Sequence, residues 1–227
     1  MPRRPLCAAL RAIEFDHPLD YEWNEPDTQS YFLYAEEDEL DRLKLLTGRA
    51  NIALALAVGE WIEARFRLYG LDPEFSDYLD AGWAGLLDTS YCEWIYLDYP
   101  HWRGPVRSPQ LLVMGIVNEA FHESEDNPEM AWRACYALNL ARYLLPEAGP
   151  FEDWLEASLV RLEKWHSWDS EGTEPDDIFA EEYWQGNPVA RELFDPDRPY
   201  QADQAEGLLE AFVLTVNREN PFLNPDD

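Results

Sequence analysis

Two motifs in this sequence have the spacing of metal ligands. They are the Glu-x-x-His pairs Glu119/His122 and Glu163/His166. Residues three apart on a helix project to the same side, so each pair could offer a carboxylate and an imidazole to one ion. Di-iron carboxylate bundles combine two such pairs with an inward Glu from each of two further helices. Glu60 or Glu63 is a candidate for one of these positions and the other has no candidate, so a metal-dependent helical enzyme stays an alternative.

The segment 169–184, DSEGTEPDDIFAEEYW, is a second group of metal-ligating residue types, with seven carboxylates and no Lys or Arg. An EF-hand loop needs Gly at its sixth position and a bidentate Glu at its twelfth, whereas Gly172 is the fourth residue here. Asp176, Asp177 and Glu181 are similar to an Asp-rich magnesium motif, but the second ligand set of such enzymes is missing. We predict no resident metal or cofactor, and we leave open whether this loop binds a cation.

Other catalytic patterns are not found in the sequence. It has no Gly-x-Ser-x-Gly elbow, no phosphate-binding glycine loop and no His-Glu-x-x-His zinc helix. Its three cysteines, Cys7, Cys92 and Cys135, are widely spaced and odd in number, which favours neither a disulfide framework nor a zinc ribbon. Cys92 and Cys135 lie in apolar patterns and are predicted to be small buried hydrophobes. We therefore predict no catalytic residues, no enzyme activity and a reducing, cytoplasmic location.

The net charge restricts the class of partner. With 46 acids against 17 bases, the formal net charge is -29. Nucleic acid and anionic membranes carry the same sign and are disfavoured as direct ligands, whereas a basic partner is favoured.

The acids are concentrated in three windows that contain no base. These lie between Arg11 and Arg42, between Arg67 and Arg103, and between Lys164 and Arg191. Each window also contains aromatic residues: Tyr21, Trp23, Tyr31, Phe32 and Tyr34; Trp83, Tyr91, Trp94, Tyr96 and Tyr99; Trp168, Phe179, Tyr183 and Trp184. Aromatic rings beside carboxylates suit the binding of Arg and Lys. Most such rings in an acidic helical protein are core residues, so the binding interpretation depends on the three windows occurring together.

Proline and Asx residues mark where the helices that position these groups begin. The patterns predict helices over 72–97, 108–124, 127–145, 150–165, 175–185, 188–194 and 201–218, and two in series over 29–69 with a break at Gly48. Ile52 to Val58, Leu111 to Val117 and Ala134 to Leu145 are apolar around most of the helix and should form the core. No run of alternating β-branched residues predicts a strand.

The fold class that follows is all-α, a single-domain irregular helical bundle of about seven to nine helices. The domain spans 1–227, with an irregular acidic N-terminal segment at 1–28, an acidic loop and short helices at 166–200, and a C-terminal tail at 219–227. In that tail, Phe222 and Leu223 lie between two Asn-Pro turns and should pack back on the body, with a docking peptide as the alternative. No apolar run is long enough for a membrane span.

An acidic, all-helical chain of this size with aromatic-rich acidic windows resembles the immunity proteins of bacterial polymorphic toxin and type VI secretion systems. The resemblance implies a protein that binds and neutralises one cognate basic toxin, often a nuclease, by stoichiometric inhibition. The alternatives are a DNA-mimic or adaptor protein for a host nucleic-acid enzyme, and the metal-dependent enzyme above. Whether the toxin's active site is occluded, and whether the protein is a homodimer, stay open. The predicted partner-binding residues are Glu174, Asp176, Asp177, Glu181, Glu182, Tyr183 and Trp184, followed by Glu36, Glu37, Asp38 and Glu39.

Overall fold

The computed structural model describes residues 6–7, 10, 18–96, 100–122, 127–147, 149–168 and 185–224. This part of the chain is mostly helical and contains no β-strand, which confirms the predicted all-α bundle. Its α-helices are α2 (Glu37–Lys44), α3 (Gly48–Phe66), α4 (Pro73–Gly85), α5 (Gly104–His122), α6 (Asn127–Leu144), α7 (Gly149–Trp165) and α8 (Ala205–Val213). Short 3-10 helices are η1 (Glu25–Tyr31), η2 (Thr89–Tyr91), η4 (Arg191–Phe194) and η5 (Ala202–Gln204).

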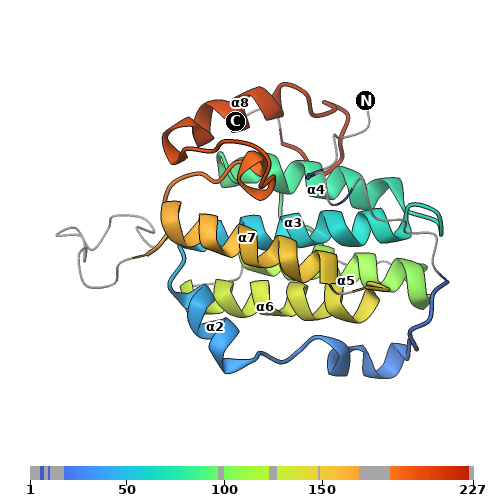
Figure 1. Ribbon diagram of the computed structural model, residues 1–227. Helices are drawn as coiled ribbons and strands as arrows, with labels where there is room; N and C mark the ends of the chain where they lie inside the picture. Colours follow the sequence, from blue (N-terminus) through green and yellow to red (C-terminus); the bar gives the residue numbers. More distant parts are fainter. Residues whose placement is uncertain are drawn as a thin grey trace.

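Helix α3 is the centre of the bundle. In Figure 1 it runs through the middle of the molecule, with α4 on one side, α5 and α6 on the other, and α7 in front. Nearly every α3 side chain is buried, because the helix is apolar around most of its circumference. Gly59 lets its neighbours approach closely, since a Cβ there would lie 2.8 Å from a Leu79 methyl on α4 and 3.2 Å from a Val113 methyl on α5.

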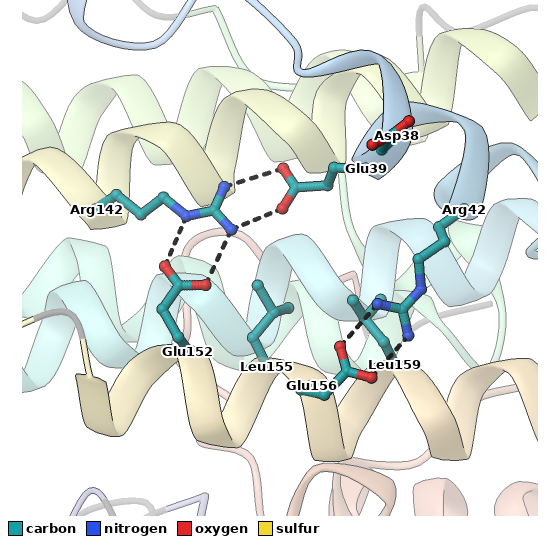
Figure 2. A pocket seen from close by; sticks show the side chains of 8 residues that line it. All are labelled: Asp38, Glu39, Arg42, Arg142, Glu152, Leu155, Glu156 and Leu159. Carbon is teal, nitrogen blue, oxygen red and sulfur yellow. Dashed lines mark hydrogen bonds and ion pairs between the residues drawn. The ribbon is translucent and has the colours of Figure 1, made fainter.

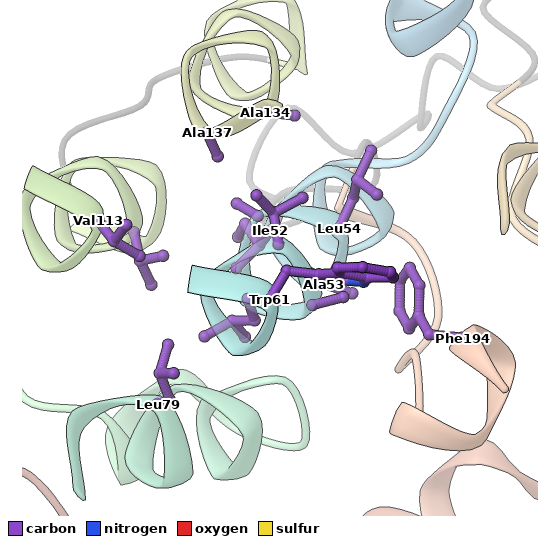
Figure 3. Close-up of a cluster of buried hydrophobic side chains, with 14 of the residues drawn as sticks. Ile52, Ala53, Leu54, Trp61, Leu79, Val113, Ala134, Ala137 and Phe194 are labelled. Atoms are coloured by element: carbon purple, nitrogen blue, oxygen red, sulfur yellow. The ribbon is translucent and has the colours of Figure 1, made fainter. Parts of the chain in front are cut away.

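The predicted core stretches contribute to the core, although Leu111 and Leu112 of the second stretch are only half-buried. All residues of 52–58 are buried, and Val113, Ala134 and Ala137 on the neighbouring helices pack toward them. Figure 3 shows these side chains converging on α3, with Leu79 from α4 and Phe194 from η4 closing the cluster. The packing of helices α4, α5 and α6 against α3 thus accounts for its uniform apolarity.

Helix α4 begins as predicted and ends earlier. Asp72 caps it by accepting a hydrogen bond from the Glu74 N–H at 3.1 Å, and Pro73 fills the first turn. The predicted helix to residue 97 is wrong, because α4 ends at Gly85. The carboxylate of Asp88 instead accepts from the backbone N–H of Ser90, which holds a 3-10 turn.

Helix α5 begins four residues before the predicted start, at Gly104, so that Pro109 lies inside it. Proline has no N–H to donate to the carbonyl of Pro105 one turn earlier. The hydroxyl of Tyr21 donates to that carbonyl instead. A side chain distant in sequence therefore satisfies the acceptor that Pro109 leaves open, and the helix continues through the proline.

Asparagine amides anchor the irregular segments on the helices. The Asn139 amide donates to the carbonyls of Phe32 and Tyr34 at 3.3 and 2.7 Å. Asn220 donates to the carbonyl of Asp77 on α4 at 2.7 Å. The chain end around Asn220 is buried against the body, with Phe222 packed edge-on against Tyr78, as predicted for the tail.

The remaining predicted helices are shorter than expected. The segment 188–194 provides only the 3-10 turn η4, and 201–218 provides η5 followed by α8, which ends at Val213. Helices α6 and α7 have almost the predicted bounds. The predicted helix at 175–185 lies, apart from its last residue, outside the described residues.

Candidate partner-binding surface

Seven of the predicted partner-binding residues lie outside the described part of the chain. They are Glu174, Asp176, Asp177, Glu181, Glu182, Tyr183 and Trp184. The other four form the beginning of α2 and can be placed. The candidate site is therefore built from α2 outward.

The first three acids of this run are available at the surface. Glu36 precedes α2 in extended conformation, and Glu37 and Asp38 occupy its first turn. All three are exposed, and none forms an ion pair with another described residue. Acids at this end of a helix also interact favourably with its dipole, so the same residues stabilise the start of α2.

Glu39 differs from its three neighbours because it is used internally. Its carboxylate accepts from Arg142 of α6 at 3.0 and 2.7 Å. The same guanidinium donates to Glu152 of α7 at 2.7 and 3.1 Å. Figure 2 shows Arg142 between these two carboxylates, so that one side chain joins α2, α6 and α7. Glu39 is a structural member of the site rather than a free carboxylate.

A second arginine fastens α2 to α7. Arg42 donates to Glu156 at 2.7 and 3.2 Å and to Glu163 at 2.6 Å. These hydrogen bonds raise the pKa of Arg42, and the bond from Arg42 holds the pKa of Glu156 below its usual range. With Leu40 and Leu43 buried beneath it, α2 presents its exposed acids from a fixed position.

The arginines lie at a cleft of about 250 Å³ between α2, α6 and α7. Asp38, Glu39, Glu152 and Glu156 line this cleft together with Arg42, Arg142, Leu155 and Leu159. Four carboxylates and two guanidinium groups line the cleft, so it keeps an excess of negative charge (Figure 2). In the sequence, Arg42 is evident only as the boundary of an acid window. The useful signal was Arg142, a lone base within an apolar helical pattern.

Trp168 and Gly186, which flank the segment 169–184, contact the junction of α2 and α3. Before the segment, the Trp168 N–H donates to the carbonyl of Leu45 at 2.7 Å. After it, the carbonyl of Gly186 accepts from Arg49 at 3.0 Å. These contacts lie at the C-terminal end of α2, whereas its exposed acids lie at the N-terminal end.

The two Glu-x-x-His pairs are engaged in other interactions. Glu119 forms an ion pair with Arg133 at 2.7 Å and Glu163 pairs with Arg42. The ring of His166 is buried, contacts the Tyr200 hydroxyl at 2.8 Å, and has its pKa lowered to about 4 by burial. Among the described residues, no three or more His, Cys, Asp or Glu side chains gather in a way that could hold a metal ion.

The cysteines are core residues, whereas few of the described window aromatics are fully buried. Cys92 and Cys135 are buried as predicted, and burial raises the pKa of each thiol to about 12. Of the described window aromatics, Trp83 and Phe32 are buried, Tyr34, Trp94 and Tyr96 are exposed, and the others are half-buried.

A groove between η1, α5 and α6 was not anticipated. It has a volume of about 450 Å³, and most of its lining is apolar, with Leu33, Leu111, Leu112 and Tyr136 among the residues. Its lining residues come from three separate parts of the sequence, so no local sequence pattern predicts the groove.

Comparisons with protein-family models, curated proteins and solved structures give no match to this chain. Within the described residues, none of the helices combines the length and the apolarity that crossing a membrane requires.

Proposed function

We propose that this protein is an immunity protein that binds and neutralises a cognate basic toxin. The observation that carries the proposal is the run Glu36-Glu37-Asp38, three exposed carboxylates at the start of a helix that ion pairs and buried leucines hold in place. A fixed acidic surface complements a basic groove that has evolved to bind phosphates. Its carboxylates present negative charge to the same basic side chains that otherwise contact the phosphates.

In this mechanism the acids and the apolar contacts have separate roles. Exposed carboxylates attract the basic partner over a distance and raise the association rate. They contribute less to the lifetime of the complex, because water and salt screen exposed pairs. Desolvated aromatic and aliphatic contacts supply most of the affinity and slow dissociation. Inhibition is stoichiometric and requires no cofactor.

The test is a pull-down from the lysate of the source organism at about 50 mM and about 500 mM salt. The proposal expects one basic protein that is retained at low salt and released at high salt. This protein should be toxic when expressed alone and harmless when co-expressed with the wild-type chain. If the retained protein is instead a resident nucleic-acid enzyme whose activity the chain inhibits, the DNA-mimic alternative replaces the proposal.

A charge-reversal variant locates the binding surface. Glu36→Lys, Glu37→Lys and Asp38→Lys together should weaken capture at low salt. The matched control is Asp203→Lys, Glu206→Lys and Glu210→Lys, which changes the net charge equally at exposed acids of η5 and α8. Equal weakening by both triple variants would show a dependence on net charge alone and would overturn the assignment to α2.

A further inference from the structure

Exposed apolar side chains gather around the groove between η1, α5 and α6. Leu33 is 46% exposed, Tyr34 is 45% exposed and Trp132 is 38% exposed. Leu33 lines the groove directly, and Trp132 packs on the lining residue Tyr136 with ring centroids 6.0 Å apart. Single exposed hydrophobics are normal, whereas several around one hollow mark an interaction site.

The groove has the dimensions and composition of a site for an apolar side chain. Its volume of about 450 Å³ exceeds that of any one side chain, and Phe32, Leu111, Leu112 and Ile116 contribute to its wall. The backbone of one wall is fixed, because Asn139 holds the carbonyl of Phe32 from α6. A preformed apolar hollow binds with little loss of conformational entropy.

The charge around the groove selects a basic occupant. Of the residues that line it, Arg133 is the one base, and Glu119 neutralises it at 2.7 Å. Asp27, exposed in η1, precedes the lining residues of that helix. Glu36 follows Leu33 by three residues, a span of at most about 10 Å of chain.

We propose that this groove is the docking site for an amphipathic segment of the basic partner. The segment inserts an aliphatic or aromatic side chain between Leu33, Leu112 and Tyr136. Its flanking Lys or Arg residues face the nearby acids Asp27 and Glu36. The inference rests on the proposed function, because it assigns the apolar contact that a complex steered by charge needs for a long lifetime.

Three short synthetic peptides test the chemistry of the occupant. One alternates Lys and Leu, one alternates Lys and Ser, and one alternates Gln and Leu, each with a terminal fluorophore for anisotropy measurements. The Lys/Leu peptide should bind at least about tenfold more tightly than either of the others, since burying one leucine is worth this factor or more. A Lys/Leu peptide that binds no better than the Lys/Ser peptide overturns the groove, and equal binding of the Gln/Leu peptide overturns the basic occupant.

Variants and cross-linking test the location. Leu33→Ser and Leu112→Ser should each remove most of the Lys/Leu advantage, while Leu214→Ser, at an 81% exposed position of the segment after α8, should leave it unchanged. Thermal unfolding verifies that the variants fold. A Lys/Leu peptide with one Leu replaced by a photoreactive residue should cross-link to Leu33 or Leu112. Cross-links confined to Trp94 and Tyr96, the exposed aromatic pair elsewhere, would overturn the assignment.

The failures of the two proposals are distinguishable. If the peptide cross-links in the groove and the pull-down yields no toxin, the docking site is supported and the immunity function is refuted. If a toxin is captured and Leu33→Ser leaves its affinity unchanged, the function stands and the groove falls. A concentration-dependent dimer that Leu33→Ser abolishes would assign the groove to a second copy of the chain and overturn the proposal.

Discussion

Glu60 of α3 and Arg191 of η4 form a buried, bidentate ion pair. The guanidinium donates through Nε at 2.8 Å and through Nη2 at 2.7 Å, and the side chains are 3% and 13% exposed. Trp83 donates to the same carboxylate at 2.8 Å, and its ring lies under the guanidinium, 5.8 Å from centroid to Cζ. This pair attaches the chain after the acidic segment to the central helix.

Arg191→Met should destabilise the fold by about 3–5 kcal/mol, because it leaves the buried carboxylate of Glu60 without its guanidinium partner. Urea unfolding gives the free energy. Lys44→Met is the control at a pair exposed on both sides. Lys44 bridges Asp41 at 3.0 Å with side chains 39% and 63% exposed, and loss of this pair should cost less than about 1 kcal/mol.

A second substitution separates burial of charge from loss of packing. Glu60→Gln combined with Arg191→Met removes both charges and keeps a hydrogen-bond acceptor for Trp83. This double variant should be more stable than Arg191→Met alone, since no uncompensated charge stays buried. A double variant that is no more stable than the single one would mean that Arg191 acts through its packing on Trp83 and Phe212.

The Glu39 and Arg142 pair should show measurable coupling. A double-mutant cycle with Glu39→Gln and Arg142→Met is expected to give about 1 kcal/mol at low salt, because the hydrogen bonds are bidentate and the groups only partly exposed. The coupling should fall at about 1 M salt. The Lys44–Asp41 pair, more exposed and joined by one bond of 3.0 Å, provides the control. Equal coupling in both cycles would refute a specific role for Arg142 in fixing α2.

Gly186 is required where the chain leaves the acidic segment. Its φ is +73°, and a Cβ there would lie 2.4 Å from Cγ2 of Thr47. Gly186→Ala should therefore cost more than about 2 kcal/mol. Gly207→Ala in α8, where a Cβ meets nothing within 4 Å, should be neutral or stabilise by up to about 1 kcal/mol. Thermal unfolding of both variants decides the point, and a tolerated Gly186→Ala would show that the turn at Thr47 rearranges.

Helix periodicity and proline punctuation predicted most of the fold, because both act within a few residues. The Asp72-Pro73 start of α4 is one example, since its cap and fixed φ are local. The same local signals could not reveal that Pro109 lies inside α5. Pro109 leaves the carbonyl of Pro105 without a backbone donor, and this carbonyl accepts from Tyr21, which is far away in the sequence.

The candidate site was predictable in composition and not in geometry. The acid run 36–39 was identified from its charge, but its division into three exposed acids and one internal partner depends on Arg142, about a hundred residues later. Similarly, Arg65 is buried in α3, where its donors reach the carbonyls of Leu144 and Pro18. Such contacts provide hydrogen-bond partners for buried polar groups. These partners are distant in sequence, so the periodicity of a single helix cannot predict them.

His166 should make stability depend on pH. Its pKa is about 4 in the native state and near 6.5 when unfolded, so between these values the unfolded chain binds a proton that the native chain does not. This contribution to stability is complete above about pH 6.5 and decreases as the pH falls toward 4, by up to about 3 kcal/mol. His166→Gln, which keeps a polar partner for Tyr200, should flatten the profile in this window. Urea titrations at several pH values measure the unfolding free energy. If this free energy depends on pH in the same way in wild type and variant, His166 is not the group responsible.

Charge reversal in the acidic segment should affect association more than dissociation. Asp176→Lys, Asp177→Lys, Glu181→Lys and Glu182→Lys together are expected to lower the association rate with the captured basic protein by about tenfold or more at low salt, and by less at high salt, because salt screens long-range electrostatic attraction. The unfolding free energy should stay near that of the wild type. Stopped-flow mixing at two salt concentrations measures the rates. An unchanged association rate would remove this segment from the binding surface and leave the α2 acids as its charged part.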